Sequence, residues 1–140
     1  MYLLDTNVLS ELIKPKPDAA VINWVMQQPP EQLYTSSITV AEMLHGVANL
    51  PTVKRKKALG KAVTDMFNED FHQRILSFDQ HAAARYAAWV QQRQQAGQPV
   101  SQSDAQIAGI ALSVNAALAT RNSRDFTGID VTLINPWESQ

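Results

Sequence analysis

The sequence has 140 residues, 45% of them hydrophobic, which is enough for one domain with a buried core. It contains no cysteine, so a disulfide framework, a thiolate zinc site and a cysteine nucleophile are excluded. A net charge of −1 and a pI near 6.3 exclude a broadly cationic nucleic-acid clamp. The longest apolar region, residues 107–119, is short and interrupted, so neither a membrane span nor a signal peptide is expected. We therefore expect one cytoplasmic domain over residues 1–140, without membrane association.

Short apolar runs alternate with helical patterns along the first half of the chain. The helical patterns are bounded by breakers such as Pro15 and the Pro29-Pro30 pair, and Asp18 has the position of a helix N-cap. In chain order, hydrophobic spacing predicts a strand over residues 2–4, a helix over 8–13, a helix over 19–26, a strand over 33–36, a helix over 38–47 and a longer amphipathic helix from after Pro51 to about Phe71. The last two helices could form a helical hairpin.

The second half continues the same alternation. It predicts a strand over residues 74–78, a helix that Asp79 caps and Gly97 ends, a helix from about Ser101 or Ser103 to about Asn115, and strands over 117–119 and 131–134. Strands that alternate with helices are typical of a parallel sheet covered on both faces. We therefore predict an α/β fold with a mostly parallel central sheet of about five strands and helices on both faces.

Three acidic residues stand where this fold would bring them to one edge of the sheet. Asp5 directly follows the first strand, Glu42 lies one turn into the helix after the second strand, and Asp104 opens the helix that precedes the fourth. In open α/β sheets, ligands bind outside the carboxyl ends of the strands. Asp104 also begins an apolar stripe that continues with Ile107 and Ala108, so its side chain should face the fold.

Carboxylates brought together in this way would repel one another, and a divalent cation would relieve the repulsion. Hard oxygen ligands without cysteine or clustered histidine favour Mg²⁺ or Mn²⁺ over zinc. Such an ion activates water for in-line attack at phosphorus and stabilises the departing oxygen. The pattern therefore indicates phosphodiester hydrolysis.

Each acidic residue also fits an ordinary structural role. Asp5 could be only a helix N-cap, Asp104 could be the capping-box partner of Ser101, and Glu42 could be a solvated helix residue. One shared site explains all three positions together, and we favour it for that reason.

Other polar and aromatic residues are weaker candidates. Arg121 and Arg124 lie beside the expected site and are suited to phosphate contacts, since guanidinium groups bind phosphate bidentately. The basic run over residues 54–57 is more typical of a solvated helix face. Trp24, Trp89 and Trp137 could stack on bases, but Trp24 and Trp89 fall within apolar helix patterns and are expected to pack in the core or at a subunit interface.

Four segments together resemble the PIN-domain ribonucleases, specifically the VapC/FitB-like toxins of bacterial type II toxin-antitoxin modules. They are residues 1–12 (MYLLDTNVLSEL), 37–46 (SITVAEMLHG), 103–108 (SDAQIA) and 120–126 (TRNSRDF). The segments occur in the family's order and at compatible separations, and the resemblance covers essentially the whole chain.

The resemblance implies a single PIN domain that acts as a metal-dependent endoribonuclease, in which Asp5, Glu42 and Asp104 hold Mg²⁺ or Mn²⁺. Family sites often contain a fourth acid where this chain has Asn122, which carries no charge, and Asp125 follows three residues later. We assign Asn122 to orienting water or phosphate and Asp125 to a secondary role. The resemblance also places the following residues close to the acids, as groups that fix carboxylates: Thr6, Asn7 and Thr120.

The resemblance also implies partners that composition does not show. These are an RNA substrate, a cognate antitoxin that covers the active site, and a second copy of the chain in a homodimer. DNA binding would come only through the antitoxin.

Two other functions compete with this interpretation. A PIN-like scaffold could bind RNA or protein without cleaving it, but all three central acids are present. A phosphatase of the haloacid dehalogenase type also begins with an apolar strand that ends in Asp, and uses a second Asp two residues later. Here that position is Asn7, which cannot transfer a proton in that way.

Overall fold

The central sheet of the computed structural model, which describes residues 1–138, contains five strands in the order β3-β2-β1-β4-β5. Every neighbouring pair in this order is parallel, as the sequence predicted. The strands are β1 (Tyr2–Leu4), β2 (Leu33–Ser36), β3 (Ile75–Leu76), β4 (Ala117–Ala119) and β5 (Leu133–Ile134). The edge strands β3 and β5 are shorter than predicted, and each has only one neighbour to extend its hydrogen-bond ladder.

The helices begin at polar caps that the sequence supplies. The Asp79 carboxylate accepts a hydrogen bond from the Ala82 N–H at 2.9 Å, and the Ser36 hydroxyl accepts one from the Thr39 N–H at 3.1 Å. The last helix ends at Asn115, whose φ of 53° is left-handed. The α-helices are α1 (Thr6–Leu12), α2 (Ala19–Gln27), α3 (Ser37–Ala48), α4 (Val53–Asp65), α5 (Gln80–Gln95) and α6 (Gln102–Val114), with short 3₁₀ turns at Pro30–Gln32 and Ser123–Phe126.

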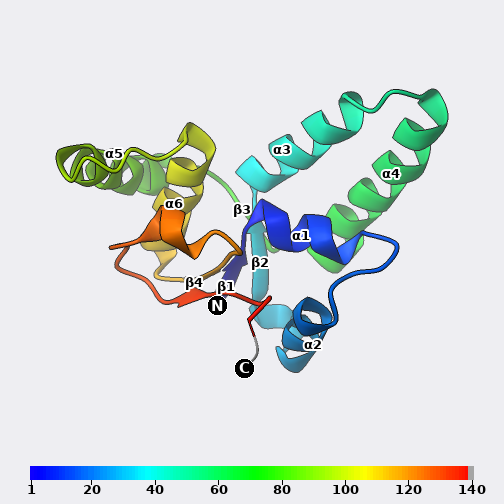
Figure 1. The fold of residues 1–140 in the computed structure, drawn as a ribbon, viewed down its shortest axis with the longest axis horizontal. Helices are drawn as coiled ribbons and strands as arrows, with labels where there is room; N and C mark the ends of the chain where they lie inside the picture. Colours follow the sequence, from blue (N-terminus) through cyan, green and yellow to red (C-terminus); the bar gives the residue numbers. More distant parts are fainter. Residues whose placement is uncertain (139–140) are drawn as a thin grey trace.

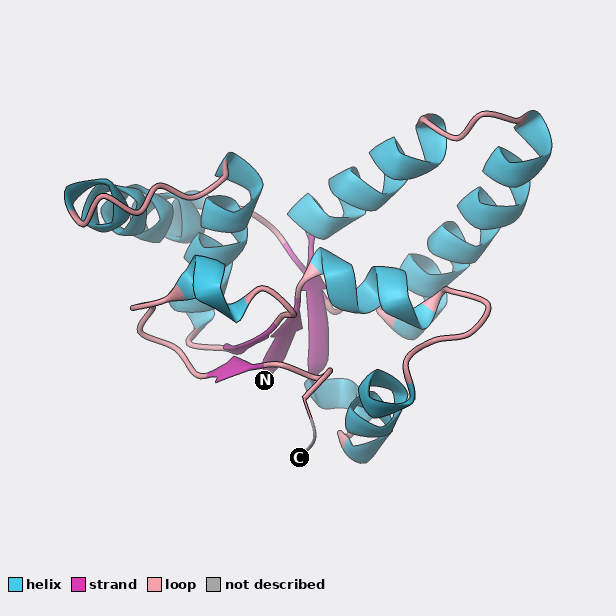
Figure 2. Cartoon of the chain, viewed as in Figure 1, coloured by secondary structure: helices cyan, strands magenta, loops and turns pink. Residues whose placement is uncertain are grey.

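Helices cover both faces of the sheet, because successive strand residues point to opposite sides (Figures 1 and 2). Leu3 and Leu118 pack with α5 and α6 on one side, while Leu4 and Ala119 pack with α1 to α4 on the other. This arrangement confirms the predicted α/β fold with two buried layers. Within residues 1–138, no helix is both long and apolar enough to cross a membrane.

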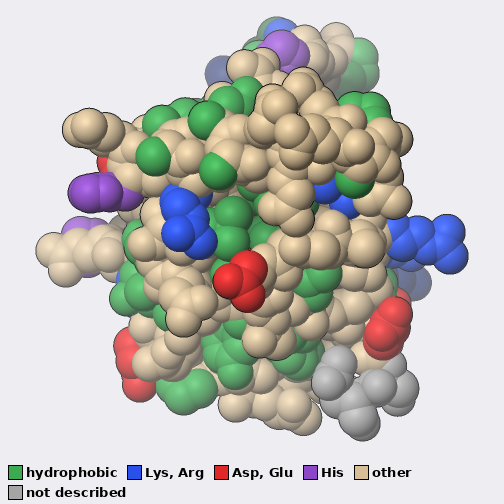
Figure 3. Space-filling view, turned by 90° about the vertical axis from the view of Figure 1, so that its left-hand side faces the viewer, with side chains coloured by type: hydrophobic (Ala, Val, Ile, Leu, Met, Phe, Trp, Pro, Cys, Tyr) green, Lys and Arg blue, Asp and Glu red, His purple; other side chains and the backbone are tan. Residues whose placement is uncertain are grey.

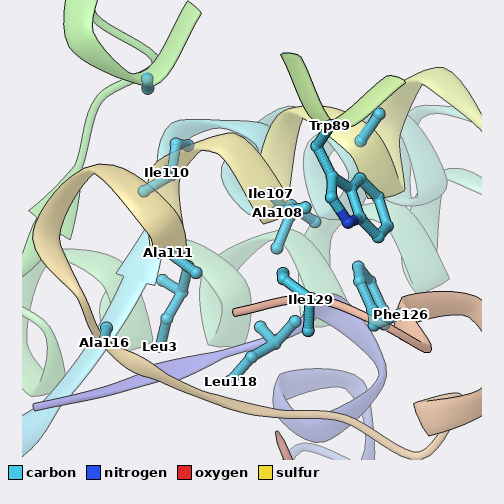
Figure 4. Close-up of a cluster of buried hydrophobic side chains, with 12 residues drawn as sticks. Leu3, Trp89, Ile107, Ala108, Ile110, Ala111, Ala116, Leu118, Phe126 and Ile129 are labelled. Carbon is cyan, nitrogen blue, oxygen red and sulfur yellow. The ribbon is translucent and has the colours of Figure 1, made fainter. Parts of the chain in front are cut away.

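The core on the α5 and α6 side is close-packed around small residues. Figure 4 shows Ile107, Ala108 and Ala111 of α6 pointing toward Leu3 and Leu118 of the sheet. Beside them, the rings of Trp89 and Phe126 stack with centroids 5.9 Å apart. The buried positions of Trp24 and Trp89 confirm that both pack in the core. The outer face on this side of the molecule exposes hydrophobic side chains between a few scattered charged ones (Figure 3).

Helices α3 and α4 form the expected hairpin, which projects from the body of the fold (Figure 1). The chain was predicted to stay helical to about Phe71, and it does so with one change, because Met66–Asp70 is a π-helical turn. There the Phe71 N–H donates to the Met66 carbonyl at 3.1 Å. The wider turn brings residues five apart nearer to one face, and Met66, Phe67 and Phe71 are all buried.

Candidate metal centre

The carboxyl ends of β1, β2 and β4 and the first turn of α6 surround one polar cavity of about 360 Å³. Asp5, Glu42 and Asp104 all line it. The three acids therefore meet at the edge of the sheet where the sequence placed them, although up to 99 positions separate them along the chain. The same cavity is lined by Thr6, Asn7, Arg121 and Asn122.

Asp5 lies deepest in the site and is 4% exposed. Its Oδ1 accepts a hydrogen bond from the Thr6 N–H at 2.8 Å, and its Oδ2 accepts one from the Thr120 hydroxyl at 2.8 Å. Burial raises the pKa of Asp5 from 3.8 to about 6; the two hydrogen bonds oppose the rise, and the charges of Asp104 and Glu42 add to it. Asp5 is thus both the N-cap of α1 and a carboxylate whose charged form is destabilised by burial.

Thr120 connects several polar groups around Asp5. Its hydroxyl oxygen accepts hydrogen bonds from the Asn122 N–H at 3.1 Å and from the Asn7 side-chain amide at 3.4 Å. The side-chain oxygen of Asn7, Oδ1, in turn accepts a hydrogen bond from the Arg121 backbone N–H at 3.3 Å. These contacts place Asn7 and Thr120 around the acids, and they fix the orientation of the Asp5 carboxylate.

Glu42 is exposed on α3 and is held toward the site by a threonine. The Thr6 hydroxyl lies 2.7 Å from Glu42 Oε1 and donates to it. The Thr6 oxygen also lies 3.0 Å from the Thr39 hydroxyl. Glu42 is therefore a solvent-exposed helix residue, and it is also hydrogen-bonded to Thr6 at the start of α1.

Asp104 occupies the first turn of α6 and is half-buried. The Asp104 backbone N–H donates a hydrogen bond to the Ser101 hydroxyl at 3.2 Å, so Ser101 caps α6 as the sequence suggested for this pair. Burial raises the pKa of the Asp104 carboxyl, the Ser101 side chain opposes the rise, and the charges of Asp125 and Glu42 add to it. Asp104 therefore takes part in the N-terminal cap of α6 and also lines the acidic cavity.

The donor set of this cavity suits a hard divalent cation, because the three acids supply oxygen ligands, and burial and neighbouring negative charge raise the pKa values of Asp5 and Asp104. In residues 1–138, however, no three acidic or histidine side chains stand close enough together to form a ready metal cluster. Direct coordination by all three acids would therefore require their carboxylates to move closer together. Coordination through bridging waters, which Mg²⁺ commonly retains, requires less movement.

The two candidates for a fourth site residue lie differently. Asn122 lines the acidic cavity itself. Asp125 does not, and instead lines a neighbouring polar cavity together with Asn122 and Arg124. Asp125 still acts on the site from a distance, because its charge raises the pKa of Asp104.

Four residues line the cavity that the sequence did not predict to lie there. Ser10 and Glu11 lie on the face of α1 that begins at Asn7, at i+3 and i+4, and Lys14 follows at i+7 just after the helix ends; this spacing would have identified them. Glu11 is 6% exposed and accepts hydrogen bonds from the Lys14 ammonium and the Asp18 N–H, each at 2.9 Å.

The fourth residue, Trp137, reaches the cavity from the segment after β5, where no periodicity marks it. Its position depends on the path of the chain after the last strand.

Comparison with known proteins assigns the chain to a family. The PIN domain family matches residues 2–131, and the chain belongs to it. It is 38% identical to the VapC ribonuclease Y4jK of Sinorhizobium fredii over 99% of each chain. It is also 38% identical to toxin FitB of Neisseria gonorrhoeae, over 98% of this chain and 99% of that protein. A solved structure of FitAB bound to an IR36 DNA fragment contains a chain that superposes with a TM-score of 0.92 and 38% identity, covering 100% of this chain and 98% of that one. Within the PIN family, the chain thus groups with the VapC and FitB toxins.

Proposed function

We propose that this chain is an endoribonuclease toxin of a type II toxin-antitoxin system that hydrolyses RNA phosphodiester bonds with Mg²⁺ or Mn²⁺. The ribonuclease and toxin names of its relatives support the class of activity. The observation that supports the metal dependence is the meeting of Asp5, Glu42 and Asp104 in one cavity, where the buried Asp5 and the half-buried Asp104 both have raised pKa values.

Asp5, Glu42 and Asp104 are the residues that would hold the cation, which when bound supplies an activated water and charge for the departing oxygen. Thr120 and Thr6 keep the carboxylates of Asp5 and Glu42 turned into the cavity through hydrogen bonds of 2.8 and 2.7 Å.

Asn122, at the cavity wall, has an amide that can both donate and accept, and we assign it to orienting water or an RNA phosphate. Asp125, the other candidate for the fourth position, lies in the neighbouring cavity.

The competing functions are weaker. A haloacid dehalogenase-type phosphatase needs an acid at position 7, and here the Asn7 amide is engaged with Thr120 and the Arg121 N–H. A non-catalytic scaffold does not explain why three acidic side chains from separate elements line one cavity.

We further propose a cognate antitoxin as partner, a homodimeric toxin, DNA binding only through the antitoxin, and action in the cytoplasm, where RNA is available. The structure of FitAB bound to a DNA fragment supports, by analogy, a partner protein and a complex that binds DNA. Purified toxin should cleave RNA, and the same toxin with its antitoxin should not. Equal cleavage by both preparations would contradict inhibition by the antitoxin.

The decisive test of the activity is RNA cleavage by purified protein. Wild-type protein should cleave RNA with Mg²⁺ and stop when chelator is added, while Asp5→Asn should lose cleavage. Asp130→Asn is the matched control, because Asp130 is exposed and does not line the cavity. Undiminished cleavage by Asp5→Asn would overturn the mechanism.

A further inference from the structure

Arg121 stands out among the basic side chains of the cavity because an aromatic ring holds it. Its guanidinium carbon lies 5.1 Å from the centroid of the Trp137 ring, and both residues line the cavity that contains the three acids. Trp137 is half-buried and packs with the core on the α1 to α4 side, whereas Arg121 is exposed. An anchored ring therefore supports a solvent-facing cation.

The Asn135 side chain locks the two residues into one unit. Its Nδ2 donates to the Arg121 carbonyl at 3.4 Å, and its Oδ1 accepts from the Trp137 N–H at 3.0 Å. Pro136, between them, is buried. The segment 135–137 is thereby joined to the loop after β4, and the ring of Trp137 is fixed beside Arg121.

The two cations of this cavity differ in what neutralises them. Lys14 is paired with Glu11 at 2.9 Å. For Arg121, no acidic side chain in residues 1–138 lies within ion-pair distance. Its charge is still felt nearby, since the Glu11 pKa is lowered mainly by Lys14, then by the Asp18 N–H, and last by Arg121. Arg121 is therefore the cation that remains available for an anionic ligand.

The ring contact leaves N–H donors of Arg121 free. A guanidinium carries five N–H donors in one plane, and a single ring on one side of it cannot occupy all of them. The remaining donors can bind phosphate in the bidentate manner. The contact also restricts a long, flexible side chain before any ligand arrives, so less freedom is lost on binding.

We propose that Trp137 is a positioning residue that holds Arg121 at the rim of the acidic cavity as a contact for an RNA phosphate. This inference rests on the proposed ribonuclease function and adds to it a specific contact for the RNA phosphate. Trp137 acts through Arg121 and does not itself touch the RNA.

The test is binding of a fluorescein-labelled single-stranded RNA, measured by anisotropy with chelator present. Arg121→Ala should weaken binding about tenfold and lower the salt dependence by about 0.7 in log K against log salt, as expected for one lost contact with single-stranded nucleic acid. Trp137→Leu, which keeps an apolar group but no π face, should weaken binding about fivefold, and Trp137→Phe should stay within about twofold of wild type. Arg85→Ala, an exposed arginine of α5, is the control and should bind like wild type.

The double variant decides between the proposal and its competitors. If Trp137 acts through Arg121, Trp137→Leu should cause no further loss in the Arg121→Ala background. An equal loss in both backgrounds would mean that Trp137 contacts a base or supports the fold, and would overturn the proposal. Wild-type binding by Arg121→Ala would overturn it as well.

Arg121→Lys tests the same pair without disturbing the core. It keeps the charge, so the salt dependence should stay as in wild type, but it loses the planar guanidinium and should bind about threefold more weakly. Wild-type affinity in this variant would count against the contact between the guanidinium and the ring. Because binding is measured without cleavage, these results are independent of the Asp5→Asn test, which alone decides whether the chain is a metal-dependent nuclease.

Discussion

The Thr120 hydroxyl donates a 2.8 Å hydrogen bond to the Asp5 carboxylate and so joins the ends of two neighbouring strands that are 115 positions apart in the sequence. The bond is buried, and it stabilises the ionised form of an acid that burial pushes toward its neutral form. The charge state of the site thus depends on a residue that is not itself acidic.

Replacing Thr120 by valine should raise the pKa of Asp5 above its value of about 6, because one of the bonds that favours the carboxylate is removed. A smaller fraction of Asp5 is then ionised at neutral pH. The acid limb of the pH–rate profile should move to higher pH, with activity at pH 7 reduced about tenfold. Thr120→Ser keeps the hydroxyl and should retain the wild-type profile; an identical profile for valine and serine would contradict the role of the bond.

Asp5→Asn should stabilise the metal-free protein at neutral pH while abolishing cleavage. The pKa of Asp5 is 3.8 ordinarily and about 6 in the fold, so between these values the folded state binds more protons than the unfolded state. Wild-type stability therefore falls as pH rises from about 4 to 6, by about 3 kcal/mol at most. The amide has no charge to bury and avoids this loss.

Thermal melts in chelator at pH 7 measure this effect, and Asp5→Asn should melt above the wild type. Added Mg²⁺ should raise the wild-type Tm and leave that of Asp5→Asn nearly unchanged, because ligand binding stabilises only a protein that binds it. At pH 4 the two proteins should differ little. A lower Tm for Asp5→Asn at pH 7 would contradict the cost assigned to burying the charged Asp5 carboxylate.

Thr6 should matter for catalysis through Glu42. Thr6→Val removes the hydroxyl that donates to Glu42 Oε1 at 2.7 Å and frees an exposed side chain to adopt other rotamers. We expect kcat/KM to fall about tenfold, as for other groups that orient metal ligands. Thr6→Ser should recover most of the activity, and equal activity in the valine variant would show that Glu42 needs no such support.

Asn122→Asp should tighten metal binding. The change places a carboxylate at the wall of the acidic cavity, where this chain has an amide. Calorimetric titration with Mn²⁺ should show affinity increased about tenfold, or a second bound ion. Asp125→Asn is the comparison: a larger effect on affinity from that variant would identify Asp125, and not position 122, as the fourth site residue.

The sequence predicts this site well where local chemistry and topology agree. Asp5 lies at the end of a predicted strand and Asp104 at the start of a predicted helix, so the topology of a parallel sheet brings them to the same edge. Trp137 was not predictable in this way, because its place beside Arg121 depends on the path of the chain after β5 and on the Asn135 bridge. The π-helical turn at residues 66–70 was also missed, since it depends on how its side chains pack and not on their spacing.

Gly109 should be needed for the close packing of α6 against α5. It lies in α6 where this helix meets α5, and a Cβ there would lie 2.5 Å from the Ala82 carbonyl oxygen and 2.8 Å from the Tyr86 Cβ. Because the obstacle includes backbone, Gly109→Ala should force the helices apart and lower the free energy of unfolding by about 2 kcal/mol. Gly46→Ala is the matched control in α3, where a Cβ meets nothing within 4 Å, and it should raise stability by about 0.5 kcal/mol. Urea unfolding of both variants measures the difference, and a Gly109→Ala protein as stable as the Gly46→Ala protein would show that α5 and α6 can separate without cost.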